Sequence, residues 1–107
     1  MDWKEKRCIP CEGGVPKVSE EQAAEWLKTL SGWEVRGDRL HKTLTLKDFR
    51  AAMSLLNQVA EVAEEEGHHP DFCVHYNRIE FTVWTHAIGG LSENDFILAG
   101  KIDSLSV

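Results

Sequence analysis

The sequence predicts an α+β domain in which three helices cover one face of a four-stranded, mainly antiparallel sheet. Apolar residues recur at three- and four-residue intervals in three segments, and they alternate with polar residues in extended runs between these segments. The elements follow one another as helix, two strands, helix, two strands, helix. Helices and hairpins segregated in this way are typical of an α+β domain.

The first predicted elements are an arm, a helix and a hairpin. Residues 1–17 show no clear period and are interpreted as an irregular arm before a domain over residues 18–107. Ser19 followed by Gln22 is a capping-box pattern, and the helix that it begins is expected to end near residues 31–32. Its apolar stripe consists of Ala23, Trp26, Leu27 and Leu30. Gly37-Asp38 is a turn dipeptide, so a hairpin is predicted over residues 33–46, where Leu40, Leu44 and Leu46 share a face that Lys42 interrupts.

A long helix is predicted from about Asp48 to Glu66, because one face of this segment is apolar throughout. That face consists of Phe49, Ala52, Met53, Leu56, Val59, Ala60 and Ala63. Gly67 marks its end, and Pro70 prevents the helix from continuing.

A second strand pair, residues 71–76 and 78–86, and a final helix complete the domain. Alternation places Ile79, Phe81 and Val83 on one face and Glu80, Thr82, Trp84 and His86 on the other. Gly89-Gly90 then breaks the chain, and Ser92 is expected to cap the last helix.

The composition indicates a cytosolic single domain. The chain has 107 residues, of which 42% are hydrophobic and 28% charged, as in soluble globular proteins. Its net charge of −6 argues against nucleic acid or an anionic membrane as the principal partner. No apolar run approaches the roughly 20 residues that span a bilayer, and residues 1–14 lack the apolar stretch that is typical of a secretory signal. Three cysteines cannot all pair within one chain, which favours reduced thiols and a cytoplasmic location.

Three histidines are expected to meet at one edge of the sheet. His68 and His69 separate the long helix from the next strand, and His86 ends the strand that pairs with it, so hairpin formation returns His86 to their neighbourhood. Glu64, one helical turn before His68, and Asp95, at the start of the last helix, can reach the same edge. Because imidazole titrates near pH 6.5, neighbouring histidines can divide proton donation and acceptance, which indicates acid–base chemistry.

Each candidate residue also has a structural interpretation. The pair His68-His69 could cap a helix end, Asp95 matches a helix-start pattern, and Glu64 belongs to an acidic run that could be a solvated face. Trp33 and Trp84 could be packing residues.

Metal binding is the competing chemical interpretation. Three histidines and a carboxylate could hold zinc, but adjacent His68 and His69 diverge along the backbone and lack the spacing of helical zinc ligands. Cys8 and Cys11 have the spacing of half a zinc knuckle or of a redox pair, but no second such pair follows. We therefore predict no metal and leave these cysteines unassigned.

Several spaced motifs follow one another along the chain, namely Gly32-Trp33, Lys47-Asp48-Phe49, Glu64-x3-His68-His69-Pro70, Tyr76-Asn77, Thr85-His86 and Gly90-Leu91-Ser92-x2-Asp95. Together they resemble the signature of the pterin-4a-carbinolamine dehydratases. The resemblance extends over roughly residues 18–103, and the arm resembles an extension found on bacterial members. Trp84 departs from the small residue expected before Thr85-His86 in animal members, which bears on pterin specificity.

The resemblance implies an activity, a site and an assembly. The activity is a hydro-lyase reaction, the dehydration of 4a-hydroxytetrahydropterin to the quinonoid dihydropterin in tetrahydropterin recycling, without metal or organic cofactor. By position it implies His68, His69 and His86 as catalytic residues and Glu64, Trp33, Asp95, Pro70 and Thr85 as substrate-binding residues. It also implies a homodimer with sheets joined edge to edge, extended in some members to a homotetramer through the helices.

Two other functions stay open at the level of sequence. Animal relatives also serve as cofactors of a transcription factor, so a dimerisation or regulatory module is one alternative, although such a module has no need of three histidines. A dehydratase-like role in molybdopterin or another pterin pathway would retain the same residues. The sequence does not distinguish dimer from tetramer, nor the acidic from the basic histidine.

Overall fold

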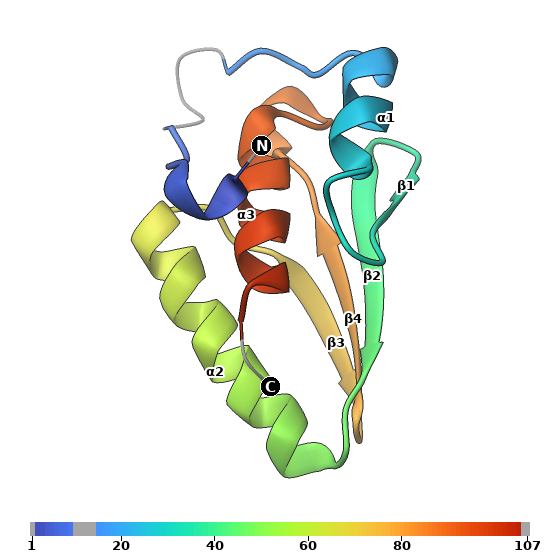
Figure 1. The fold of residues 1–107 in the computed structure, drawn as a ribbon, viewed down its shortest axis with the longest axis vertical. Helices are drawn as coiled ribbons and strands as arrows, with labels where there is room; N and C mark the ends of the chain where they lie inside the picture. Colours follow the sequence, from blue (N-terminus) through green and yellow to red (C-terminus); the bar gives the residue numbers. More distant parts are fainter. Residues whose placement is uncertain (1, 10–14, 106–107) are drawn as a thin grey trace.

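A computed structural model describes residues 2–9 and 15–105, and its helices lie on one face of a single sheet (Figure 1). The helices are α1 (Glu20–Leu27), α2 (Phe49–Glu66) and α3 (Glu93–Asp103). The strands are β1 (Glu34–Arg36), β2 (Arg39–Thr45), β3 (Asp71–His75) and β4 (Arg78–Val83). Two short 3-10 helices, η1 (Trp3–Glu5) and η2 (His86–Ile88), complete the described elements. The predicted α+β class and element order are confirmed.

The sheet has the order β1-β2-β4-β3, and each pair of neighbours is antiparallel. In the central pair, Leu40 of β2 lies opposite Val83 of β4. On the other side of β4, Phe81 lies opposite Phe72 of β3. Strands β1 and β3 are therefore the edges, and β4, which leads toward His86, is enclosed by two neighbours.

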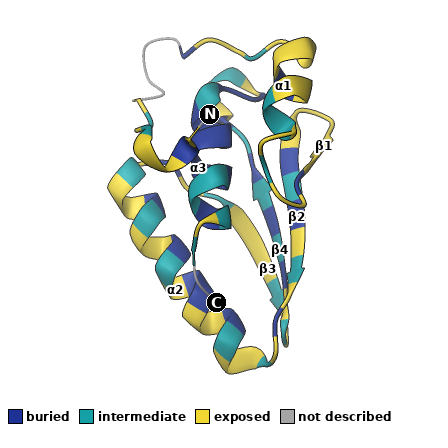
Figure 2. Ribbon diagram, in the orientation of Figure 1, coloured by how far each residue is buried: buried dark blue, intermediate teal, exposed yellow. Residues whose placement is uncertain are grey.

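The inner face of the sheet forms the core with α2 and α3 (Figure 2). Ile79, Phe81 and Val83 are fully buried, as their alternation predicts. Lys42, which interrupts the apolar pattern of β2, is only 8% exposed. Its ammonium group lies 2.6 Å from Asp103 at the end of α3, so that the buried charge is compensated by an opposite one.

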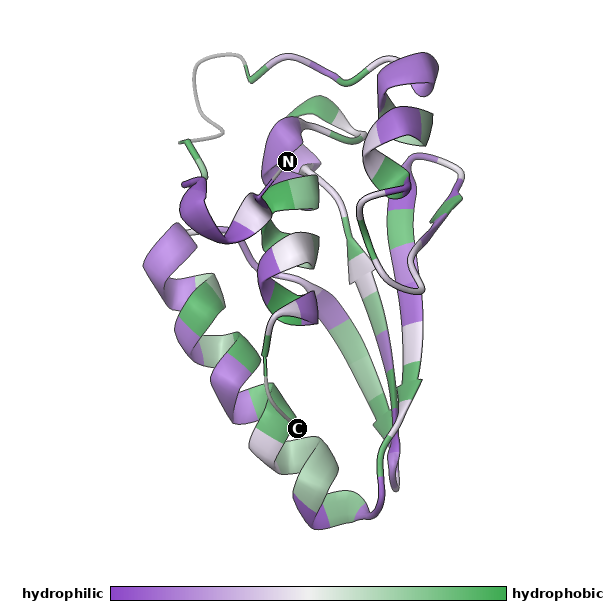
Figure 3. Ribbon diagram, viewed as in Figure 1, coloured by the Kyte–Doolittle hydropathy of each residue, from purple (hydrophilic) through white to green (hydrophobic). Residues whose placement is uncertain are grey.

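Helix α2 has the predicted length, but its buried face is shifted from the predicted one. Asp48 accepts a hydrogen bond from the Ala51 amide at its start, and Gly67 ends it in the left-handed conformation with φ 66°. The buried residues are Ala52, Leu55, Leu56, Val59 and Ala63. Phe49 and Met53, predicted to be on this face, are 50% and 38% exposed. They flank the buried stripe, since each residue advances the helix by about 100°. Hydrophobic and hydrophilic residues alternate along the ribbon of α2 in Figure 3.

Two predicted boundaries are wrong by several residues. Helix α1 ends at Leu27 rather than near residues 31–32, because a series of tight turns through Leu30 follows it. Strand β4 ends at Val83 rather than at residue 86. Beyond it the Thr85 amide donates to the Gly90 carbonyl at 2.8 Å, which closes a turn containing η2 and removes His86 from the strand.

The described part of the N-terminal arm packs against the domain. Trp3 is buried, its ring lies 6.1 Å from that of Phe96 in α3, and its indole N–H donates to the Thr29 hydroxyl. Cys11, in the two-cysteine motif of the sequence, lies outside the described residues. No helix within residues 2–9 and 15–105 combines the length and apolarity needed to cross a membrane.

Candidate active site

A cleft of about 340 Å³ opens where α2 and β4 end and η2 begins. Its lining consists of Gly67, His68, His69, Trp84, His86 and Ala87. The three histidines that the sequence predicts to meet therefore all border one cleft. The chain reaches it from two directions, through the end of α2 and through the β4–η2 connection, as hairpin topology predicts.

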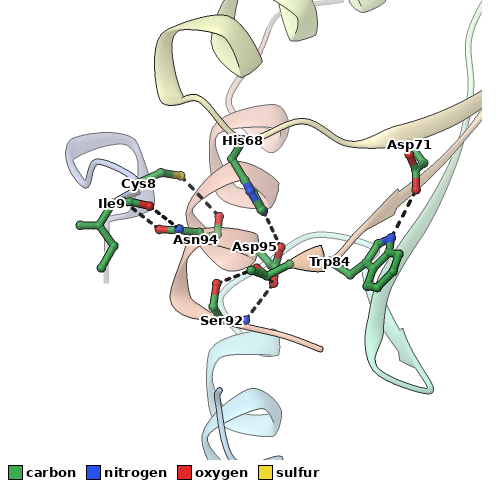
Figure 4. A network of polar contacts seen from close by, with 9 residues as sticks. Cys8, Ile9, His68, Asp71, Trp84, Ser92, Asn94 and Asp95 are labelled. Carbon is green, nitrogen blue, oxygen red and sulfur yellow. Dashed lines mark hydrogen bonds and ion pairs between the residues drawn. The ribbon is translucent and has the colours of Figure 1, made fainter. Parts of the chain in front are cut away.

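His68 is held by a buried network of polar groups (Figure 4). Its side chain is 8% exposed, and its Nε2 lies 2.6 Å from Oδ1 of fully buried Asp95. Oδ2 of Asp95 accepts hydrogen bonds from the Thr85 hydroxyl and the Ser92 amide, both at 2.8 Å. A carboxylate only accepts hydrogen bonds, so Nε2 of His68 carries a proton and donates a hydrogen bond to Asp95.

Asp95 is thus both a helix-capping residue and the partner of a histidine. With Ser92 it forms the capping box that begins α3, which confirms the structural interpretation of its position. Its second oxygen is directed at His68 across 27 residues of sequence. Thr85 supports the same carboxylate, so Thr85 and Asp95 lie behind His68 rather than on the cleft surface.

His69 makes a second histidine–carboxylate pair, which is exposed. Its Nε2 lies 2.6 Å from Oε2 of Glu64, and the two side chains are 59% and 77% exposed. Glu64 lies one helical turn before His68 in sequence, but it pairs with His69, because the left-handed Gly67 reverses the chain after α2. His68 consequently enters the interior and His69 returns over the last turn of the helix.

His86 is stacked on an aromatic ring. Its imidazole lies 4.0 Å from the Trp84 ring at an interplanar angle of 24°. The guanidinium carbon of Arg39 lies 4.1 Å from the same indole, and the indole N–H donates to Asp71 at 3.3 Å. Arg39 and Asp71 were not predicted as site residues, because their proximity to Trp84 follows from strand register, which no local motif reveals.

Trp33 and Pro70, which were also predicted as site residues, do not line the histidine cleft. Trp33 is buried in the core, and its indole N–H donates to Asp103 at 2.9 Å. Asp103 ends α3 whereas Asp95 is in its first turn, so the structure does not bring Trp33 to the cleft. Pro70 lines an adjoining cavity of about 230 Å³, which it shares with Glu64, His69 and residues of α2 and β3.

The chemistry available at the cleft is proton transfer. One imidazole is fixed by a buried carboxylate, one is paired at the surface, and one is stacked on indole. Within the described ranges 2–9 and 15–105, no three His, Cys, Asp or Glu side chains are grouped to hold a metal ion. Fold and site together define a small α+β protein with a cleft bordered by histidines, two of them paired with carboxylates, and such side chains can donate and accept protons.

The chain belongs to the pterin 4 alpha carbinolamine dehydratase family, whose model matches residues 16–105. It is 48% identical to a pterin-4-alpha-carbinolamine dehydratase proposed in Nitrosomonas eutropha, over 99% of this chain and 95% of that protein. It is 41% identical to the mitochondrial pterin-4-alpha-carbinolamine dehydratase 2 of Arabidopsis thaliana, over 99% of this chain and 60% of that protein. The crystal structure of a transcriptional coactivator/pterin dehydratase from Brucella melitensis superposes with a TM-score of 0.80 at 33% identity, covering 83% of this chain and 97% of the other.

Proposed function

We propose that this protein dehydrates pterin-4a-carbinolamine to the quinonoid dihydropterin by histidine acid–base catalysis. Membership of the family supports the substrate class. The observation that carries the mechanism is the meeting of His68, His69 and His86 around one cleft. A molecule the size of a bicyclic pterin suits a cleft of about 340 Å³.

The reaction needs only one proton donor and one proton acceptor from the protein. The C4a–O bond breaks, the hydroxyl leaves with the bonding electron pair, and one proton converts it to water. Loss of the N5 proton supplies the electron pair for a new N5–C4a double bond. One proton enters and one leaves, and no group is oxidised or reduced, so a pair of imidazoles in opposite protonation states suffices.

Each histidine has a distinct support in this mechanism. Buried Asp95, 2.6 Å from His68, orients that ring through its Nε2. Glu64 does the same for His69 in a solvated setting. Trp84 restrains the ring of His86 by stacking. One imidazolium protonates the leaving oxygen and another imidazole accepts the N5 proton.

The substrate-binding residues divide into two groups. Glu64 and Pro70 border the cavity next to the histidine cleft and are placed to contact a bound pterin. Asp95 and Thr85 act through His68. Trp33 is left out of the proposed contacts, because its indole is directed at Asp103 in the core.

The assembly and the compartment are part of the proposal. We place the protein in the cytoplasm as a homodimer, or a homotetramer built from two dimers. Exposed apolar side chains on the edge strand β3 and on α2, Phe72, Phe49 and Met53, favour self-association. Sedimentation velocity at micromolar concentration tests this assembly, and a monomer at all concentrations would contradict it.

Stopped-flow dehydration of synthetic 4a-hydroxytetrahydropterin tests the activity. The wild-type protein is expected to accelerate dehydration above the spontaneous rate, and the double variant His68→Ala/His69→Ala to abolish the acceleration while keeping its circular dichroism spectrum. No acceleration by folded wild-type protein would refute the proposed function and favour another pterin or a binding role.

A further inference from the structure

The N-terminal arm is hydrogen-bonded to Asn94, the residue that precedes Asp95. The Ile9 amide donates to Oδ1 of Asn94 at 3.0 Å, and Nδ2 of Asn94 donates to the Ile9 carbonyl at 2.7 Å (Figure 4). Asn94 is 1% exposed. This two-way amide contact fixes both the distance and the orientation between the arm and the first turn of α3.

The preceding residue of the arm is bonded to the end of α2. The Cys8 amide donates to Oε1 of Glu66 at 2.8 Å. Oε2 of Glu66 lies 3.0 Å from Nε of Arg7 and 3.1 Å from Nζ of Lys101, and the Glu66 side chain is 3% exposed. Although burial raises the pKa of Glu66, the Cys8 hydrogen bond and the two cations outweigh it and lower the pKa below its ordinary value.

These two contacts flank the two halves of the buried His68–Asp95 pair. Glu66 is the last residue of α2, two positions before His68, and Asn94 immediately precedes Asp95. Adjacent arm residues, Cys8 and Ile9, therefore hold together the two helix ends whose side chains meet at 2.6 Å. Trp3, buried against α3, anchors the other end of the arm.

We propose that residues 2–9 form a clamp that sets the His68–Asp95 geometry, with Glu66 and Asn94 as its positioning residues. His68 follows a glycine in the left-handed conformation and belongs to no helix or strand, so its place depends on how the end of α2 is held. The kinetic consequence of the clamp rests on the proposed dehydratase function. The structural consequence, a looser His68–Asp95 hydrogen bond when the clamp is cut, does not.

Two substitutions cut the clamp from different helices. Asn94→Ala removes both amide contacts to Ile9, and Glu66→Ala removes the acceptor of the Cys8 amide. Glu66→Gln keeps an acceptor for the Cys8 amide. It is the conservative variant, which we expect to fold and to keep most of the wild-type His68–Asp95 geometry. Asp48→Ala is the matched control, because it removes a helix cap at the far end of α2 without touching the arm.

The first readout is the proton NMR resonance of the hydrogen between His68 and Asp95 in the ligand-free protein, assigned by its loss in His68→Gln. We expect a downfield signal that Asn94→Ala and Glu66→Ala broaden or shift upfield, and that Asp48→Ala and Glu66→Gln retain. The second readout is kcat and KM for dehydration. Since a displacement of 1 Å can cost roughly 100-fold in rate, we expect kcat to fall about tenfold with KM little changed.

The outcomes separate this inference from the proposed function. An unchanged resonance in both clamp variants overturns the clamp, and so does an equal loss of signal and kcat in Asp48→Ala at a similar fall in Tm. A resonance that responds as expected, in a protein that does not accelerate dehydration, supports the clamp and refutes the dehydratase assignment.

Discussion

His68 and Asp95 are 27 positions apart in sequence, and their side chains meet at 2.6 Å in the interior. The carboxylate that receives the histidine also completes the capping box of α3. Helix initiation and histidine orientation therefore depend on the same group. Each oxygen of Asp95 has its own task, since Oδ1 faces His68 and Oδ2 accepts from Ser92 and Thr85.

Because the two oxygens of Asp95 have different partners, we predict that Asp95→Asn lowers kcat far more than it lowers the free energy of unfolding. The amide oxygen can replace Oδ2 as the acceptor for Ser92 and Thr85, and the amide nitrogen then faces His68 as a donor. His68 would have to present an unprotonated Nε2, so its protonated and accepting edges would be exchanged. We expect kcat to fall at least about 100-fold and the free energy of unfolding to fall by about 1 kcal/mol or less.

Stopped-flow kinetics and urea unfolding measure these two effects. Asp48→Asn is the matched control, because it makes the same change at the N-cap of α2, where Asn is as good a cap as Asp. A normal kcat in Asp95→Asn would show that the tautomer of His68 is irrelevant to the reaction.

The exposed pair predicts a weaker, salt-dependent effect. Glu64→Gln is expected to lower kcat only about two- to fivefold, because charge interactions between solvated side chains are weak. The difference from wild type should shrink in 1 M salt, where the Debye length is about 3 Å. Glu65→Gln, one residue along the same helix, controls for net charge. An effect of Glu64→Gln as large as that of Asp95→Asn would contradict the different burial of the two pairs.

Trp84 is predicted to act through the ring of His86. Trp84→Ala removes the stacked partner, and since aromatic pairs contribute about 0.5–1.5 kcal/mol, kcat should fall roughly two- to tenfold. Trp84→Phe retains a ring and should recover most of the activity. Steady-state dehydration with the three proteins measures this. Equal rates in Trp84→Ala and wild type would show that the stack does not position His86.

Local sequence patterns predicted much of the fold, because strand alternation, the apolar face of a helix and helix caps all depend on residues that are close in sequence. Alternation placed Ile79, Phe81 and Val83 inward, and an apolar face predicted α2 with its caps at Asp48 and Gly67. The meeting of the histidines followed from hairpin geometry alone.

The remaining features depend on contacts distant in sequence. The histidine that pairs with Glu64 could not be predicted, because a single left-handed residue, Gly67, decides which histidine turns inward. Trp33 was assigned by family position, whereas its place follows from long-range contacts with Asp103 and Phe81. The arm gave no periodic signal, since much of its attachment is made by backbone amides to side chains of other elements.

Glu66 predicts how stability depends on pH. Its pKa is lowered in the folded protein, despite the opposing effect of burial, by the Cys8 amide and the charges of Lys101 and Arg7. A carboxyl whose folded-state pKa lies below its unfolded value of about 4.5 contributes its full stabilisation above that value. The contribution is lost as the pH falls from there through the folded-state pKa.

Glu66→Gln should therefore reduce the free energy of unfolding by about 1–2 kcal/mol at pH 7. The difference should narrow below about pH 4.5, because the carboxyl of the unfolded wild-type protein is protonated there, and it should vanish once the folded-state carboxyl is protonated as well. Urea unfolding of both proteins at pH 7, 5, 4 and 3 measures this, with Glu65→Gln as the control for net charge. A difference between Glu66→Gln and wild type that stays constant down to pH 3 would mean that the charge of Glu66 does not contribute to the free energy of unfolding.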